Sequence, residues 1–292
     1  MNKKYKKFNY KHSLGQNFIT DEFILEDICD NSNINNSDFV IEIGSGNGAL
    51  TRSICERAKY VITIEIDTSL IPLLKSNLAM YNNVSIINAD FISYNFKNII
   101  DEFLKHGYNY TAIKVVANVP YYITSLIINN LLCNPFISEM TLMVQKEVAE
   151  RVVAVPNTKD YGILTIFCNY FSNTNLLMIV PKNYFYPVPK VDSAVVHFKK
   201  FDKYICISKT NPIYDITQNF DNEYYKLFNL VKSSFSQRRK KLLNTLSNVM
   251  NLDKNLLINI FDKLNFDLNC RAENLSLESY QNLLMHIEKL SN

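Results

Sequence analysis

Residues Phe39 to Leu50 read FVIEIGSGNGAL: a short apolar run, then glycines at alternate positions, then the start of a helix-forming stretch. The glycines allow backbone angles that other residues avoid, and they let a ligand approach bare backbone where a strand passes into a helix. Dinucleotide-binding enzymes use a similar turn, usually with the spacing G-x-G-x-x-G, whereas the spacing here is G-x-G-x-G. The segment predicts a cofactor-binding turn at the end of a parallel strand and leaves the cofactor open.

Further strand-length apolar runs surround this turn, each separated from the next by room for a helix. This alternation is typical of a parallel sheet covered on both faces, and it predicts a doubly wound α/β domain. The predicted strands are Phe39–Ile43, Tyr60–Ile66, Val84–Ile87, Ile113–Ala117 and Met140–Val144.

The last strands of the sheet are expected to pair antiparallel, unlike the parallel strands before them. Past the apolar run Ile163–Cys168, the connections become shorter and the turn-rich segment Tyr186–Pro189 appears. We therefore expect an antiparallel pair at the end of the sheet. Its two strands would be Leu176–Val180 and Ala194–Phe198.

Helical periodicity replaces the strand pattern in the last third of the chain. Apolar residues recur there at spacings of three, four and seven, which gives one apolar stripe along a helix. They are Phe228, Val231, Phe235, Leu242 and Leu246. We therefore expect two domains: an α/β domain over residues 1–200 and a small all-helical domain over residues 201–292.

Composition narrows the class of protein. The chain is 47% hydrophobic and 20% charged, which is typical of a globular protein and excludes a disordered chain. No apolar run approaches the ~18–20 residues of a membrane-spanning helix, and no signal-type segment follows the lysine-rich start, so we expect a cytoplasmic protein.

The 6 cysteines are scattered and none stands at zinc-ligand spacing with the 4 histidines, so we expect buried thiols and no metal. Without a sustained heptad or a disulfide framework, a monomer is the default expectation.

Basic residues are concentrated in two places, although the net charge is only +3. Residues 1–20 hold five lysines and no acid, and residues 224–252 also contain no acid. Such stretches are typical of binding to nucleic-acid phosphates, although a solvated surface gives the same pattern. The candidate nucleic-acid-binding residues are Lys232, Arg238, Arg239, Lys240 and Lys241, interpreted as part of one basic helix.

Two carboxylates are candidates for holding the cofactor. Glu65 lies at the end of the second predicted strand, 21 residues past Gly44, where it can accept hydrogen bonds from ribose hydroxyls. This arrangement fits NAD and S-adenosylmethionine equally. Asp90, at the end of the third strand, could accept from an adenine amino group, but a turn-capping role explains it as well.

The fourth predicted strand ends in the tetrapeptide Asn118-Val119-Pro120-Tyr121. An exocyclic adenine amine is a poor nucleophile because its lone pair is delocalised into the ring, so methylating it needs acceptors that hold the amine hydrogens. The side-chain carbonyl of Asn118 and the backbone carbonyl of Val119 can do this, while Pro120 fixes the turn and Tyr121 stacks on an extruded base. A plain strand-to-helix turn is the alternative interpretation.

Together with further blocks, these motifs resemble the KsgA family of small-subunit ribosomal RNA adenine N6,N6-dimethyltransferases. The resemblance runs from His12 to about Tyr280. The additional matching blocks are Leu14–Phe18, Gln145–Arg151, Tyr161-Gly162, Pro187–Val196, Gln237–Lys240 and Arg271–Asn274. The resemblance implies a class I S-adenosylmethionine-dependent methyltransferase fold, Rossmann-like with a seven-stranded sheet, and a small C-terminal all-helical domain that helps to hold RNA.

The resemblance also implies a site and a substrate. The cofactor S-adenosylmethionine would be held by Asn17, Ile19, Gly44, Gly46, Glu65, Asp90 and Asn118, where Gly46 is added from the glycine-rich turn. Phe185 stands where the family has an aromatic residue that sandwiches the flipped base with Tyr121. The implied substrate is a pair of adjacent adenosines in a hairpin loop near the 3′ end of small-subunit rRNA, methylated in a pre-30S-type particle during maturation.

Departures from the family pattern are few, and the alternatives are limited. Ser45 stands where the family often has proline, and Val119 where it often has leucine. One alternative is the related large-subunit (23S) rRNA adenine dimethyltransferase of the macrolide-resistance type. Others are a ribosome-assembly factor without catalysis and an NAD-dependent dehydrogenase, for which no hydride-transfer residues are evident.

Overall fold

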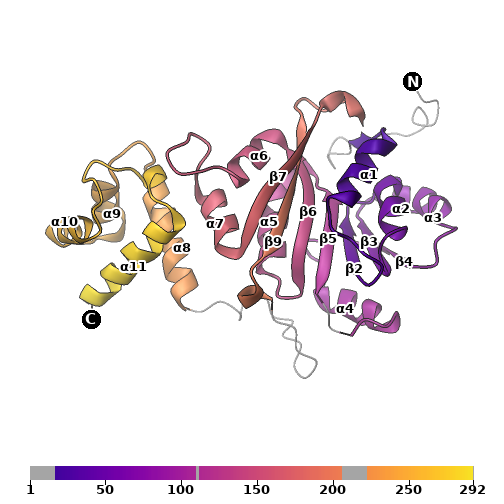
Figure 1. Ribbon diagram of the computed structural model, residues 1–292, viewed down its shortest axis with the longest axis horizontal. Coiled ribbons are helices and arrows are strands. Elements are labelled where there is room, and N and C mark those ends of the chain that lie inside the picture. Colours follow the sequence, from indigo (N-terminus) through magenta and orange to yellow (C-terminus); the bar gives the residue numbers. More distant parts are fainter. Residues whose placement is uncertain (1–16, 110–111, 206–221, 292) are drawn as a thin grey trace. The chain divides into compact units, whose positions relative to one another are not determined.

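A computed structural model describes residues 17–109, 112–205 and 222–291 of the chain, and these residues form two compact units (Figure 1). The first unit contains the described residues up to Ala149 and those from Phe171 to Ile205. The second contains Glu150–Tyr170 and the described residues from Asn222 on. This division differs from the single boundary expected near residue 200, because residues 150–170 leave the first unit and join the second. The basic N-terminal tail lies outside the described residues.

The first unit is built on a seven-stranded sheet with the strand order β4-β3-β2-β5-β6-β9-β7. The strands of this sheet are β2 (Phe39–Ile43), β3 (Tyr60–Glu65), β4 (Val84–Asn88), β5 (Ile113–Asn118), β6 (Ile137–Gln145), β7 (Ser172–Val180) and β9 (Ser193–Lys200). The seven-stranded Rossmann-like fold is thereby confirmed. The predicted antiparallel end is confirmed as well, since β9 pairs antiparallel with both β6 and β7.

The order of the parallel strands fixes where a ligand can bind. From β2 the chain continues to β3 on one side, while β5 lies against the other side of β2, and both pairs are parallel. The carboxyl ends of β2, β3 and β5 therefore meet at one edge, where the direction of the strand order reverses. Open α/β sheets bind ligands at this switch point.

Helices cover both faces of the sheet in the first unit. They are α1 (Glu22–Asp30), α2 (Ala49–Cys55), α3 (Ile71–Asn77), α4 (Phe96–Lys105) and α5 (Thr124–Cys133), with short 3₁₀ turns at η3 (Thr68–Leu70), η4 (Tyr121–Ile123), η5 (Lys182–Tyr184) and η6 (Asp202–Tyr204). Neighbouring residues of β2 point to opposite faces: Val40 packs in a core cluster with residues of α1 and α2, whereas the ring of Phe39 lies 5.1 Å from that of Phe103 on α4. Burial on both faces explains why β2 has no polar alternation apart from Glu42.

A second, two-stranded sheet joins distant parts of the chain. Strand β1 (Phe18–Ile19) pairs antiparallel with β8 (Phe185–Tyr186), with Phe18 opposite Tyr186 and Ile19 opposite Phe185. The backbone N–H of Thr20 extends this contact by donating to the carbonyl of Tyr184 at 2.9 Å. The segment before α1 is therefore held beside the end of η5.

The second unit has its own hydrophobic core. Its helices are α7 (Ile163–Phe171), α8 (Asn222–Phe235), α9 (Leu242–Met250), α10 (Lys254–Lys263) and α11 (Leu277–Ser291), with the 3₁₀ turn η8 (Ala272–Asn274). The last residue of α7, Phe171, is assigned to the first unit. Helix α6 (Lys146–Val152) begins in the first unit and ends in the second. Fully buried residues such as Leu230, Leu246, Phe261 and Tyr280 form one cluster among these helices. The apolar run Ile163–Cys168, whose composition fits a buried strand or a buried helix, belongs to α7.

Candidate active site

The glycine-rich turn lies between β2 and α2, as predicted, and its geometry requires glycine. Gly44, Gly46 and Gly48 all have φ between +57° and +80°. At Gly46 a side chain is excluded a second time, because an added Cβ would lie 2.5 Å from the ring of Phe18. The backbone of Gly46 therefore lies directly against the ring of Phe18 in β1.

Glu65 ends β3 with both carboxylate oxygens anchored. One oxygen accepts from the backbone N–H of Gly46 at 2.8 Å, and the other accepts from the N–H of Asp67 at 2.8 Å. Burial raises the pKa of Glu65, against the opposing effect of these two hydrogen bonds. The carboxylate is thus fixed at the pocket wall, with lone pairs left over for hydroxyl donors.

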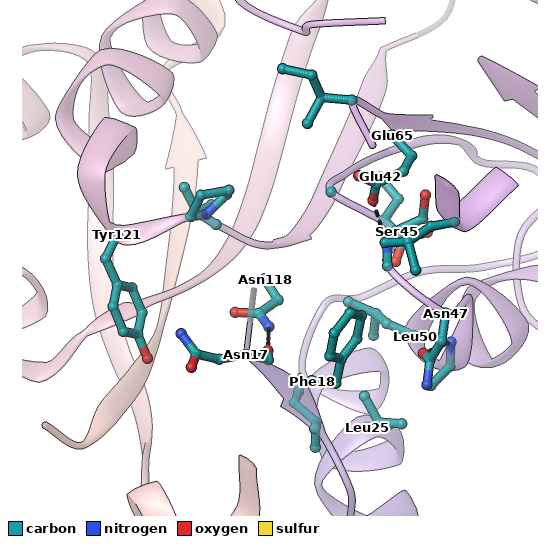
Figure 2. A pocket seen from close by; sticks show the side chains of 18 residues that line it. Asn17, Phe18, Leu25, Glu42, Ser45, Asn47, Leu50, Glu65, Asn118 and Tyr121 are labelled. Carbon is teal, nitrogen blue, oxygen red and sulfur yellow. Dashed lines mark hydrogen bonds between the residues drawn. The ribbon is translucent and has the colours of Figure 1, made fainter. Parts of the chain in front are cut away.

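Asn118 ends β5, and its side-chain amide is oriented by the N-terminal segment. Its Nδ2 donates to the backbone carbonyl of Asn17 at 3.0 Å (Figure 2). With the NH₂ group used in this way, the orientation of Oδ1 is fixed, and Oδ1 is the acceptor that the amide can offer to a substrate amine. The following residue, Val119, is buried and held by its N–H to the carbonyl of Met143 at 3.0 Å.

Tyr121 lines the same pocket, and its phenol shares a hydrogen bond of 2.6 Å with the hydroxyl of Ser193 on β9. Burial raises the pKa of the Tyr121 phenol. A neutral phenol tied at its tip leaves the ring as the part available for contact, which fits a stacking surface rather than a base.

The pocket collects most of the predicted cofactor and catalytic residues. Among its lining residues are Asn17, Ile19, Gly44, Gly46, Glu65, Asn118, Val119, Pro120 and Tyr121. In Figure 2, Tyr121 and the Asn118 amide lie on one side, and Glu65 and Ser45 lie on the other. All of these residues belong to the first unit.

Two predicted site residues lie elsewhere. Asp90 is exposed, its carboxylate accepts from the N–H of Ile92 at 3.0 Å, and it is not among the residues that line the pocket. Phe185 is only 2% exposed and packs in the core cluster with Ile19 and Val195. A ring buried to this degree cannot stack on an incoming base unless β8 rearranges, so the arrangement matches core packing.

Sequence reasoning missed several residues of the pocket wall. They are Phe18, Leu25, Glu42, Ser45, Asn47, Ala49, Leu50, Ile66 and Leu70. Glu42 is 1% exposed, accepts from the hydroxyls of Thr51 and Thr63, and has a pKa raised to about 7, mainly by burial. A lone acid inside an otherwise apolar strand was the signal that could have identified it.

These groups fit S-adenosylmethionine. Glu65 presents a fixed carboxylate to ribose hydroxyls, and the half-exposed Ile66 beside it offers an apolar surface to a base. The glycine-rich turn exposes backbone that a ligand can approach closely. The Ser45 hydroxyl in this turn is buried without a hydrogen-bond partner among the described residues. The pocket wall therefore combines an apolar surface at Ile66 with polar groups at Glu65 and Ser45, which suits a ligand that is partly apolar and partly polar.

The predicted RNA-binding residues lie in the second unit, but not on one helix. Lys232 is exposed on α8, whereas Arg238–Lys241 form the turn between α8 and α9, so the expected continuous basic helix is wrong. Arg238 pairs with Glu273 at 2.8 Å and also donates to the carbonyl of Lys159. Lys241 donates to Asn269 at 2.5 Å, while Arg239 and Lys240 are exposed.

Metal-binding clusters and membrane-spanning helices are both absent from the residues that the structure describes. No group of three or more histidine, cysteine or acidic side chains there could hold a metal ion. No helix in the same ranges is long and apolar enough to cross a membrane.

Two curated relatives are similar over almost the entire chain. The protein of Clostridium botulinum (strain Okra / Type B1) described as ribosomal RNA small subunit methyltransferase A is 41% identical over 277 residues, covering 94% of this chain and 93% of the relative. The protein of the same description from Alkaliphilus oremlandii (strain OhILAs) is 41% identical over 285 residues, covering 97% and 93%.

Solved structures agree with the fold. A dimethyladenosine transferase from Plasmodium falciparum superposes with a TM-score of 0.75 at 26% identity, covering 94% of this chain and 98% of the other. The 23S rRNA methyltransferase ErmE gives a TM-score of 0.68 at 23% identity, covering 93% and 99%, a likeness that shows the fold alone.

The chain also matches a model of a whole protein family. The model described as Ribosomal RNA adenine dimethylase matches residues 7–289, which include every residue of the pocket. The chain therefore belongs to the ribosomal RNA adenine dimethylase family.

Proposed function

We propose that this S-adenosylmethionine-dependent rRNA adenine dimethyltransferase acts on the small ribosomal subunit. Its target would be a pair of adjacent adenosines in the hairpin loop near the 3′ end of small-subunit rRNA, each receiving two methyl groups on N6. The observation that supports methylation of an amine is the Asn118 amide, whose NH₂ group donates to the Asn17 carbonyl and so directs its own carbonyl toward an acceptor role. The two relatives at 41% identity, both described as small subunit methyltransferases, support the choice of subunit.

Positioning accounts for the chemistry that this chain supplies. The cofactor, when bound, supplies a methyl group on a positively charged sulfur. Asn118 Oδ1 and the Val119 carbonyl would hold the hydrogens of the adenine amine while its nitrogen becomes pyramidal, which localises the lone pair toward the methyl. Pro120 fixes the turn, and the Tyr121 ring would stack on the extruded base. After transfer the product amine carries a positive charge and is strongly acidic, so it gives its extra proton to solvent water and no side chain has to act as a base.

The setting of the reaction is part of the proposal. The substrate would be RNA within a pre-30S-type particle in the cytoplasm, and the enzyme would act as a monomer. The exposed Arg239, Lys240 and Lys232 would contact phosphates, an interaction that weakens as salt rises because bound counterions are released.

The test compares substrates and one substitution. Labelled methyl transfer is measured on unmethylated small subunits and, in parallel, on naked large-subunit rRNA, with nuclease mapping of the product. Dimethyladenosine in the 3′-terminal hairpin is the expected result. Label in large-subunit RNA alone would assign the enzyme to the resistance type, and subunit binding without label would indicate an assembly factor.

The substitution Asn118→Ala removes the acceptor. Transfer should fall ~100-fold or more, as when one polar group that stabilises a transition state is removed, while affinity for the subunit is largely kept. Asn98→Ala, an exposed asparagine on α4, is the matched control and should transfer at the wild-type rate. Wild-type activity in Asn118→Ala would contradict the assignment.

A further inference from the structure

Ser45 is the one residue of the glycine-rich turn with a side-chain hydroxyl, and it lines the pocket (Figure 2). The residue is 6% exposed, and its Oγ has no hydrogen-bond partner among the described residues. Buried hydroxyls are normally paired, so a group that is left unpaired needs an explanation. Here the unpaired atom belongs to the wall of a ligand pocket.

The surrounding bonds hold Ser45 where it is. The N–H of Gly44 donates to the carbonyl of Ile64, and the N–H of Gly48 donates to the carbonyl of Ser45, both at 2.8 Å. The N–H of Gly46 is taken by Glu65. With the backbone bonded on both sides, the turn cannot carry the hydroxyl out to water without breaking these contacts.

The two carboxylates of the pocket already have donors. Glu42 accepts from Thr51 and Thr63, and Glu65 accepts from two backbone N–H groups. Neither carboxylate is a hydrogen-bond partner of the Ser45 hydroxyl. The missing partner of the Ser45 hydroxyl must therefore come from outside this set.

We propose that Ser45 is a cofactor-binding residue whose hydroxyl hydrogen-bonds to a polar group of bound S-adenosylmethionine. The inference depends on the assignment of this pocket to the cofactor, and it is independent of which rRNA is methylated.

The decisive variant is Ser45→Ala, which removes only the hydroxyl. In the absence of ligand, its midpoint of thermal unfolding should equal or exceed that of the wild type, because an unpaired buried group is lost. Its affinity for S-adenosylhomocysteine, measured by titration calorimetry, should fall about three- to tenfold, the effect of one hydrogen bond. A merely structural serine would not move the two quantities in opposite directions.

Ser53 on α2 provides a matched control. It is also 6% exposed, but its hydroxyl donates to Glu26 at 2.8 Å, and it does not line the pocket. Ser53→Ala should therefore lower the unfolding midpoint and leave the affinity unchanged.

A second ligand identifies the part of the cofactor involved. A loss of affinity for both S-adenosylhomocysteine and 5′-methylthioadenosine would place the bond on the adenosine part, and a loss for the former alone would place it on the amino-acid part. Unchanged affinity for both ligands would overturn the proposal, as would a fall in midpoint as large as that of Ser53→Ala. Failure of the wild type to bind either ligand would instead overturn the assignment of the pocket.

Discussion

Lys200, the last residue of β9, is a lysine with only 3% of its surface exposed. Its Nζ donates to the backbone carbonyl of Asn134 at 2.6 Å, and burial lowers its pKa to about 7. In the unfolded chain the pKa returns to about 10.4. Between these two values the unfolded state binds more protons than the folded state, so the contribution of Lys200 to stability rises with pH across this window.

Lys200→Met should therefore raise the free energy of unfolding at pH 7, on the order of 1 to 3 kcal/mol. The advantage over the wild type should shrink toward pH 10, because the lysine of the unfolded wild-type chain then also loses its proton and folding no longer has to remove it. Urea unfolding of both proteins at pH 7, 8.5 and 10 measures this difference. Lys199→Met, at the exposed neighbour, should give a small difference at every pH. A constant advantage for Lys200→Met would contradict the account.

Individual residues of the site were predictable to the extent that local sequence fixes them. Asn118 and Glu65 stand at strand ends that periodicity predicts, and the structure places both in the pocket. Phe185 was not predictable in this way, because its burial comes from the pairing of β8 with β1, far away in the sequence. Nothing in the residues around Phe185 reveals that pairing.

The turn between α8 and α9 shows where element-scale prediction reaches its limit. The apolar spacing from Phe228 to Leu246 suggests one helix, yet α8 ends at Phe235 and α9 begins at Leu242. Serines around the break favour local hydrogen bonds over the helix, as when the Ser236 hydroxyl donates to the carbonyl of Ser233. In a continuous helix, Arg238 and Lys241 would also stand three residues apart on one face, where like charges repel. Apolar periodicity is not sensitive to either effect.

The same turn separates a stabilising arginine from one that is available for RNA. Arg238→Ala should lower the unfolding midpoint, because the side chain links the turn to Glu273 and to the carbonyl of Lys159. Arg239→Ala should leave the midpoint unchanged, weaken RNA binding, and reduce the slope of log K against log salt by about 1. Calorimetry and RNA binding at several salt concentrations test both statements. An unchanged slope in Arg239→Ala would exclude this residue from phosphate contact.

At the scale of the whole molecule, the described residues contain separate hydrophobic cores. The core of the second unit is formed from Tyr161, Ile166 and the helices from α8 onward, and the cofactor pocket lies entirely in the first unit. The two classes of element were predictable, because strand runs and helical periodicity are local signals. The assignment of residues 150–170 to the second unit was not predictable, because it depends on which hydrophobic core buries α7.

The separate cores predict a local response to ligand. S-adenosylhomocysteine should slow amide hydrogen exchange in β2, β3 and β5, whose ends form the pocket, and leave α9 and α10 unchanged. Exchange measured by mass spectrometry with and without ligand distinguishes the two units. Equal protection of both would show that they open as one cooperative body.

The pairing of β1 with β8 has a consequence for a chain that is still being synthesised. Asn17, Phe18 and Ile19 form part of the pocket wall, yet the partner strand of β1 is Phe185–Tyr186. The glycine turn, Glu65 and Asn118 leave the ribosome well before that strand exists. In a nascent chain the glycine-rich turn, Glu65 and Asn118 can therefore fold before Asn17–Ile19 have a partner strand. Cofactor binding can stabilise the complete pocket only after Tyr186 has been synthesised.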